Sequence, residues 1–375
     1  MTKKLHILFL CSWYHSKVFP TNGDFIQRHA EAVSLLHKVS VLHIVSDSTI
    51  STSKIEFKKT NNVNTYIGYV KSTSNSFLKF FRFLKMYFLL LKKIGKFDLI
   101  HLNVLYPFGW FALHQKLIYK TPYIISEHWT GYHLPQAKNI SFIEKSFSKY
   151  ISKNAAFICP VSNDLKLSMQ KFGLTGNYNP IPNVVDTDLF KPAMLNKEDE
   201  YSIVHISSLK NDHKNISGML KAAKILESDL TNFTWTFIGG NGNEYKNEVL
   251  DLKFSSAKIN FIDHLSQDEL IPFLQKAKVF VLFSYYENLP CVILEAFSSG
   301  TPVISTNVGG ISEYFPEEFG FFVPLNNSIE LASKIKELYN QPINKSEEMH
   351  QYAKENFSKL VIAEKFTELY FKSIH

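Results

Sequence analysis

The feature that most constrains this chain is a regular alternation of short apolar runs with amphipathic stretches, repeated in two series. Such alternation is typical of a mostly parallel sheet with helices on both faces. In the first series we expect strands at residues 5–10, 39–45, 64–69, 98–103, 122–126 and 156–161. We expect helices at residues 24–37, 75–95, 108–119 and 162–172.

The second series follows NPIPNVVDTDLFKP, residues 179–192, whose three prolines and several turn formers predict a linker. Its strands are expected near residues 201–207, 234–238, 258–262, 279–284, 302–306 and 320–323. The sequence therefore predicts two Rossmann-like, doubly wound α/β domains in tandem. This suits a chain of 375 residues, because a single core rarely organises more than about 250–300 residues.

We place the first domain at residues 1–188 and the second at 189–354. A final amphipathic stretch, residues 355–375, predicts a helix with no strand after it, and we expect this helix to pack back on the first domain. Ligands of doubly wound sheets bind beyond the carboxyl ends of the strands. The site is therefore expected there, between the two sheets.

Cysteine usage and the first residues favour a cytoplasmic protein. Cys11, Cys159 and Cys291 lie far apart without a CxxC pair, so neither a disulfide framework nor a zinc site is suggested. The start MTKKLHILFLCSWYH imitates a signal peptide, but its apolar run is short and no small-residue cleavage site follows. No stretch has the roughly 18 uncharged apolar residues that a membrane span needs.

The net charge of +7 is the sum of two opposite parts. Residues 1–188 contain 23 Lys and Arg against 10 Asp and Glu, a net charge of +13, whereas the remainder carries −6. The basic half suggests an anionic partner such as a membrane surface, a phosphate or a nucleic acid. A nucleic acid is disfavoured, because Arg28 and Arg82 are the only arginines and leave almost none for base contacts.

Residues 77–94 predict a basic amphipathic helix. At 100° per residue its basic side chains fall within an arc of about 140°, and Phe and Leu fill most of the rest. These basic residues are Lys79, Arg82, Lys85, Lys92 and Lys93. Two interpretations stay open: the helix covers one face of the sheet with its lysines in water, or it docks on anionic lipid as a peripheral membrane contact.

The most informative segment is residues 284–315, in which Glu287 lies in a loop after a strand and Glu295 on the helix that Pro290 opens. A helix N-terminus offers free amides and a positive dipole end, which suits a diphosphate. Carboxylates nearby suit sugar hydroxyls, because they accept several hydrogen bonds. The Gly309–Gly310 turn that follows allows a close backbone approach. Taken alone, the two glutamates could also be solvated surface acids.

Glu287, Glu295 and the run EAFSSGTPVISTNVGGISE closely resemble the nucleotide-sugar signature of glycosyltransferase family 4 (glycosyl transferases group 1), retaining enzymes of the GT-B fold. The resemblance extends over nearly the whole chain. In the first half, FPTNGDFIQRHAEAV resembles the first glycine loop and helix, and SEHWTGYH resembles the segment with a His beside the reacting sugar. In the second half, the resemblance includes PIPNVVDTDLFKP, FIGGNGNEY, and FIDHLSQDELIPFLQKAKVFVLFS with its base-binding strand.

The resemblance implies a site in which Glu287 holds hydroxyls of the donor sugar, Lys214 neutralises the diphosphate and His128 contacts the sugar near its anomeric centre. The residues implied in donor binding are Gly23, Ser208, Lys214, Ile262, Asn288, Leu289, Pro290 and Glu295. The donor is then a nucleoside diphosphate sugar, and the acceptor a glycan or lipid-linked glycan of surface polysaccharide biosynthesis. No metal cofactor is expected, because Asp186 and Asp188 match a structural segment of the family and not a metal site.

The chain departs from the family at Ser208, where the family has an arginine six residues before the lysine. Lys210, His205 and His213 are candidates to supply the missing charge. The departure keeps alternatives open: a nucleotide-sugar epimerase or phosphorylase of the same fold, or a non-catalytic family member that binds glycan or lipid.

Overall fold

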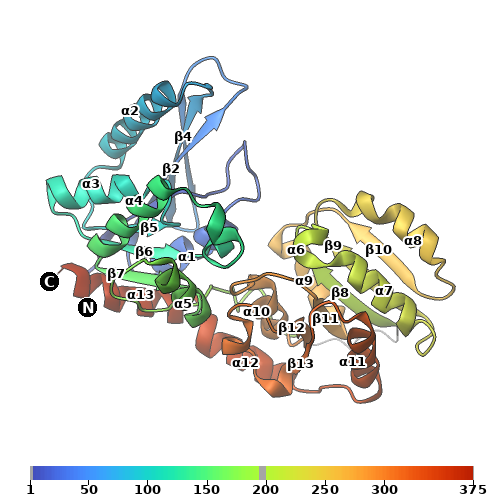
Figure 1. The fold of residues 1–375 in the computed structure, drawn as a ribbon. Helices are drawn as coiled ribbons and strands as arrows, with labels where there is room; N and C mark the ends of the chain where they lie inside the picture. Colours follow the sequence, from blue (N-terminus) through green and yellow to red (C-terminus); the bar gives the residue numbers. More distant parts are fainter. Residues whose placement is uncertain (1–2, 194–199, 375) are drawn as a thin grey trace. The chain divides into compact units, whose positions relative to one another are not determined.

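The computed structural model describes residues 3–193 and 200–374. The chain divides into two compact units, Met1–Val184 together with Lys359–His375, and Val185–Ser358 (Figure 1). The break falls inside the proline-rich segment, four residues before the end of the first domain that the sequence suggests. Each unit is built around one sheet.

The first unit contains a seven-stranded sheet with the order β3-β4-β2-β1-β5-β6-β7. The strands are β1 His6–Cys11, β2 Lys38–Asp47, β3 Lys54–Thr60, β4 Val63–Lys71, β5 Leu99–Asn103, β6 Tyr123–Glu127 and β7 Phe157–Pro160. All neighbours are parallel except β3, which runs antiparallel to β4 at the edge. Every residue of β1 is buried, as expected for a central strand covered on both faces.

The helices of the first unit are α1 Asp24–Ser34, α2 Ser76–Ile94, α3 Gly109–Tyr119, α4 Phe142–Asn154, α5 Asn163–Phe172 and α13 Lys359–Ile374, with short 3₁₀ turns at Thr130–Tyr132 and Gln136–Asn139. The final helix α13 packs on α1 within this unit. Its residues Ile362, Phe366 and Tyr370 belong to the same core as Phe9 of β1. Residue 375 of the expected helix lies outside the described residues.

Two elements of the first unit are absent from the expectations drawn from the sequence. The edge strand β3 reads KIEFKKT and is largely exposed, so it lacks the apolar run by which the other strands were predicted. Helix α4 has Ser141 as its N-cap, whose side chain accepts a hydrogen bond from the Glu144 amide at 3.2 Å. It carries exposed aromatic residues among its lysines, which blurs the amphipathic pattern.

The second unit contains a six-stranded sheet with the order β10-β9-β8-β11-β12-β13, and all its neighbours are parallel. The strands are β8 Tyr201–Ile206, β9 Phe233–Ile238, β10 Lys258–Ile262, β11 Val279–Leu282, β12 Val303–Thr306 and β13 Gly320–Val323. The helices are α6 Asn211–Lys214, α7 Ile216–Leu226, α8 Lys246–Leu252, α9 Gln267–Lys276, α10 Cys291–Ser298, α11 Ser328–Asn340 and α12 Ser346–Phe357, with 3₁₀ turns at Gly242–Tyr245, Ile311–Tyr314 and Glu317–Phe319.

Both sheets reverse their strand order once, between β1 and β5 in the first and between β8 and β11 in the second. At such a reversal the connections leave to opposite sides, and the loops after the two strands enclose a crevice. The prediction of two doubly wound Rossmann-like domains is therefore confirmed. The two reversals mark where the site residues of each unit should be sought.

None of the helices within residues 3–193 and 200–374 combines the length and the apolar character of a membrane-spanning segment. The stretch that came nearest to a membrane span in the sequence, residues 77–94, lies in helix α2.

Candidate active site

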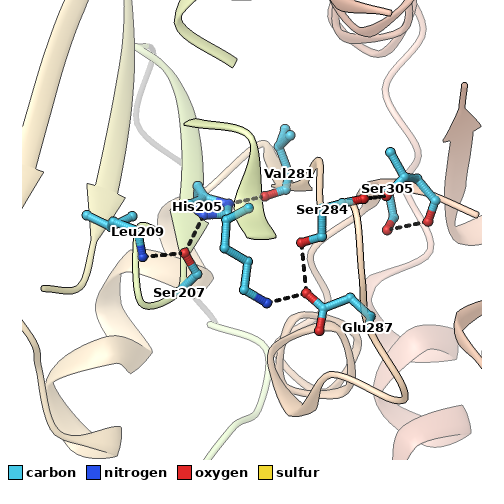
Figure 2. A network of polar contacts seen from close by, with 9 residues as sticks. His205, Ser207, Leu209, Val281, Ser284, Glu287 and Ser305 are labelled. Carbon is cyan, nitrogen blue, oxygen red and sulfur yellow. Dashed lines mark hydrogen bonds and ion pairs between the residues drawn. The ribbon is translucent and has the colours of Figure 1, made fainter. Parts of the chain in front are cut away.

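The reversal point of the second unit holds an ion pair between Lys214, at the end of α6, and Glu287, in the loop after β11 (Figure 2). The Ser284 hydroxyl donates a second hydrogen bond to the same carboxylate oxygen of Glu287 at 2.7 Å. The side chain of Lys214 is 18% exposed and that of Glu287 is 10% exposed. Because the pair is largely withdrawn from water, removal of either partner would leave a poorly solvated charge.

A second network fixes the loop after β8, from which α6 begins (Figure 2). The buried His205 ring donates from Nδ1 to the Val281 carbonyl of β11 at 2.8 Å, and its Nε2 accepts from the Ser207 hydroxyl at 2.7 Å. The Leu209 amide donates to the same Ser207 oxygen at 2.9 Å. Burial lowers the pKa of the His205 imidazole to about 3. Both ring nitrogens are thus engaged within the unit and burial favours the neutral imidazole, which argues against His205 as the group that replaces the charge missing at Ser208.

The loop between β11 and α10 is held by a glycine turn and by a neighbouring strand. Gly309 has φ of +58°, and a Cβ there would lie 2.0 Å from the Glu287 carbonyl oxygen. The Gly310 amide donates to the Asn288 carbonyl at 2.8 Å, and the Thr306 hydroxyl donates to the Ser284 carbonyl at 2.7 Å. The two glycines thus allow a close backbone approach to the Glu287–Asn288 segment.

Helix α10 begins directly after this loop. Pro290 has φ of −70° and ψ of 125° and is the N-cap, so the helix starts at Cys291, one residue later than expected. Asn288 and Leu289 are buried, and Glu295 is 1% exposed on the helix. The N-terminus of α10, with its positive dipole end, and the carboxylate of Glu287 therefore belong to one short segment, which suits an anion with attached hydroxyls.

Ser208 and Ile262 each lie next to a second glycine turn, on the same sheet edge. Gly239, with φ of +146°, donates its amide to the Ile262 carbonyl at 2.9 Å, and a Cβ there would lie 1.7 Å from the Ser207 carbonyl oxygen. The Asn241 side chain donates to the Ser208 carbonyl at 3.0 Å. The exposed Ser208 side chain and the end of β10 therefore line one edge.

The first unit holds the two remaining candidates, Gly23 and His128. Gly23 has φ of +75° just before α1, and a Cβ there would lie 3.0 Å from the backbone of Trp13 and Tyr14, in the loop after β1. The His128 ring follows β6 and lies 4.3 Å from the Phe25 ring and 5.3 Å from the His29 ring, measured between centroids. Burial, together with nearby His29 and His101, lowers the pKa of His128 well below its usual range.

The residue that positions His128 was not anticipated from the sequence. The fully buried Glu127 carboxylate accepts backbone hydrogen bonds from Leu105 at 3.0 Å, His128 at 2.9 Å and Trp129 at 3.0 Å. Burial raises the pKa of Glu127, although these amides act in the opposite direction. An acid at the end of an apolar run, directly before a candidate site histidine, was the available signal.

Among the described residues, no three His, Cys, Asp or Glu side chains gather as a metal site. Asp186 accepts the Leu189 amide at 3.2 Å and so closes a turn.

The two halves of the chain match two family descriptions that adjoin each other. Residues 27–189 match Glycosyltransferase Family 4, and residues 186–356 match Glycosyl transferases group 1. The chain belongs to glycosyltransferase family 4. The resemblance seen in the sequence is confirmed, and the units described above are the two domains of the GT-B fold.

Curated relatives of the family are distant. An uncharacterized glycosyltransferase of Methanocaldococcus jannaschii is 29% identical over 257 residues, 66% of this chain and 69% of the relative. The UDP-Gal:alpha-D-GlcNAc-diphosphoundecaprenol alpha-1,3-galactosyltransferase of Escherichia coli is 28% identical over 221 residues, 53% of this chain and 55% of the relative.

Solved structures of similar fold cover the whole chain. The sucrose-phosphate synthase of Thermosynechococcus elongatus has a TM-score of 0.77 at 17% identity and covers 98% of both chains. Anabaena HepE in complex with UDP has a TM-score of 0.75 at 15% identity, covering 97% of this chain and 99% of the other. At these identities the likeness shows the fold alone.

Proposed function

We propose that the protein is a retaining glycosyltransferase that moves a sugar from a nucleoside diphosphate sugar to an acceptor hydroxyl. The observation that carries the proposal is the Lys214–Glu287 ion pair, set at the sheet reversal beside the N-terminus of α10. A cation, a helix N-terminus and a carboxylate are what a sugar diphosphate needs. The first two meet its phosphates, and the carboxylate accepts hydrogen bonds from sugar hydroxyls.

In this proposal the Lys214–Glu287 ion pair is the arrangement of the donor site before the donor binds. When the donor binds, the Lys214 ammonium turns from Glu287 to the diphosphate oxygens, and Glu287 accepts sugar hydroxyls in exchange. The Ser284 hydroxyl, 2.7 Å from Glu287, keeps the carboxylate in place during the change. Glu295 is proposed to hold the ribose hydroxyls. Ile262, beside the Gly239 turn, is proposed to contact the base.

Charge on the leaving diphosphate is then stabilised by Lys214 and by the amides of α10. The family arginine is replaced by Ser208, and both ring nitrogens of His205 are engaged within the unit, which leaves Lys210 and His213 on the same short segment as the basic residues nearest in sequence. The chemistry is mainly positioning and charge stabilisation, with no metal required. Retention follows if the leaving diphosphate helps to deprotonate the acceptor on the face from which it departs.

The first unit is proposed to bind the acceptor, with Gly23 near the diphosphate and the neutral imidazole of His128 near the anomeric carbon. The Escherichia coli relative uses a UDP-sugar and a diphosphoundecaprenol-linked acceptor, and HepE was solved with UDP. These names support a uridine donor and a lipid-linked acceptor of surface polysaccharide biosynthesis. Helix α2, with its lysines and exposed Phe77 and Phe81, supports contact with the inner face of a membrane.

A thermal-shift screen of nucleoside diphosphates and their sugars tests the donor half of the proposal. We expect UDP or a UDP-sugar to raise the melting temperature of the wild type in the presence of EDTA, and the Lys214→Ala variant to lose most of the shift. Transfer to a lipid-linked glycan is then assayed with that donor. Product from the nucleotide sugar without an acceptor would indicate an epimerase, and a requirement for inorganic phosphate would indicate a phosphorylase. No shift with any nucleotide would refute the donor site.

A further inference from the structure

The first unit contains a large apolar cavity of about 1050 Å³ that the donor chemistry does not use. This volume lies at the upper end of the roughly 300–1,000 Å³ typical of ligand pockets. Its wall is largely aromatic and includes Trp13, Phe80, Phe83, Trp110, Ile143 and Phe147. The Phe80 and Trp110 rings stack at 5.2 Å between centroids, so the wall is a preformed surface.

The cavity opens beside two helices that expose large apolar side chains. On α2, Phe77 is 77% exposed, and on α4, Phe142 and Ile143 are 84% and 69% exposed. Isolated apolar residues on a surface are common, but a group of them around an apolar cavity indicates a ligand or a membrane. Ile143 lines the cavity and Phe77 directly follows the lining residue Ser76, so these two exposed side chains continue the lining of the cavity outward.

Polar groups of the cavity favour an anion with a hydroxyl over a neutral hydrocarbon. Among the described residues that line it, none is a carboxylate, and Lys79 of α2 supplies a cation, with its Nζ 5.9 Å from the centre of the Phe83 ring. The His43 Nδ1 donates to the Cys11 carbonyl at 2.8 Å, whereas its buried Nε2 has no hydrogen-bond partner among the described residues. Buried polar atoms are normally satisfied, so this nitrogen is available to a hydroxyl of a bound molecule.

The cavity also lies where an acceptor is needed. Ser12 and Trp13 follow β1, His43 and Ser46 belong to the end of β2, and Tyr106 follows β5. These are the carboxyl ends of the strands beside the reversal of the first sheet, the edge at which doubly wound domains bind ligands.

We propose that this cavity binds the hydrocarbon chain of a phosphate-bearing lipid acceptor, with the phosphate at Lys79. The acceptor role of the lipid rests on the proposed function. The binding of a lipid rests on the cavity alone. The chain lies against the aromatic wall between α2 and α4, and the exposed side chains of these two helices meet the surface from which the lipid is taken.

The test is calorimetric titration of the full chain with butyl, octyl and dodecyl phosphate, each below its micelle-forming concentration. Each buried methylene contributes about a factor of three to four in affinity, and dodecyl phosphate has eight more methylenes than butyl phosphate. Dodecyl phosphate is therefore expected to bind at least about a hundredfold more tightly even if only about four of the eight are buried. Phe147→Glu places a charge on the wall at a half-exposed position and should weaken dodecyl phosphate about tenfold. Lys79→Met should weaken dodecyl phosphate several-fold and leave dodecyl glucoside unchanged.

The matched control is Phe142→Glu, which changes an exposed residue on the same helix that does not line the cavity. It should leave dodecyl phosphate binding within about twofold of wild type. Equal losses in the two Glu variants, or an affinity independent of chain length, would overturn the lipid site. Both variants should keep the thermal shift with UDP. The alkyl phosphates carry no sugar hydroxyl, so the acceptor role is tested with a lipid-linked glycan. If this glycan lipid competes with dodecyl phosphate for the cavity but receives no sugar in the transfer assay, the acceptor role and the proposed function fail and the lipid site stands.

Discussion

At the carboxyl ends of β8, β9, β11 and β12 the second unit places an ion pair, two glycine turns and a helix N-terminus. The same edge of the first unit carries imidazoles that burial keeps neutral and a large apolar cavity. Both sheets reverse their strand order once at these edges, so the contrast comes from the loops and helices placed there. One edge is organised to balance the charge of a diphosphate, and the other to fit the shape and apolar surface of a second substrate. Each prediction below changes a residue or condition on which that contrast depends.

The largest effect is expected at Lys214. Lys214→Ala should lower kcat/KM for transfer by about a hundredfold or more, because the variant loses the cation that stabilises the leaving group. Lys221→Ala removes an exposed lysine of α7 in the same unit and should change kcat/KM by less than about threefold. Similar losses in both variants would mean that the overall positive charge of the unit acts and not the Lys214–Glu287 pair.

The next largest effect is expected at Glu127. Its substitution tests whether a buried carboxyl holds the edge of the first unit. Glu127→Ala leaves three backbone amides without their acceptor and should lower the free energy of unfolding by about 2–4 kcal/mol. Glu127→Gln keeps one acceptor oxygen and should recover part of the loss. Urea unfolding followed by circular dichroism measures both; a wild-type curve for Glu127→Ala would contradict the positioning role of this side chain.

The neutral histidines predict a smaller, pH-dependent effect. Burial lowers the pKa of His29 and His43 to about 4, below the value of about 6.5 in an unfolded chain. Between these values the unfolded state binds more protons, so stability is fully present above pH 6.5 and falls as the pH decreases toward 4.

At pH 5 each such histidine should cost about 2 kcal/mol relative to pH 7. The raised pKa of Glu127 acts in the opposite direction and offsets part of the loss. Urea unfolding at pH 7 and pH 5 measures the sum. In His43→Gln the difference between the two pH values should shrink, and an unchanged difference would argue against a neutral His43.

The smallest effect is expected at Ser208. This side chain is exposed, so an arginine can enter without displacing the core. Ser208→Arg should tighten the binding of the nucleoside diphosphate by about threefold to tenfold, because it adds a charge-assisted hydrogen bond beside Lys214. Weaker binding, measured by calorimetry, would show that another group already occupies this space.

Most of the sheet architecture could be predicted from the sequence, because buried parallel strands are continuous apolar runs and these are easy to find. The edge strand β3 was missed because its apolar residues, Ile55 and Phe57, alternate with charged residues at the surface and form no continuous apolar run. Helix α4 was missed because Phe142, Ile143 and Phe147 are exposed, which breaks the rule that apolar side chains of a helix point inward.

The site could be predicted only in part, for a different reason. Glu287 and Lys214 were found as matches to a motif, but their pairing joins residues 73 positions apart and depends on the strand order β8-β11. The neutral state of His205 depends on burial, which no local pattern reports. The apolar cavity is assembled from the ends of three strands and three helices, so no single stretch of sequence carries it.

Helix α13 has a consequence for how the protein is made. Its Phe366 and Tyr370 complete the core around β1, yet they are synthesised after the whole of the second unit. Domains normally fold during synthesis in the order in which they emerge. Here the second unit, Val185–Ser358, is continuous and available first, whereas the first unit waits with part of its core exposed until residues 359–374 have been added. The first half of the nascent chain is thus the half most in need of a chaperone.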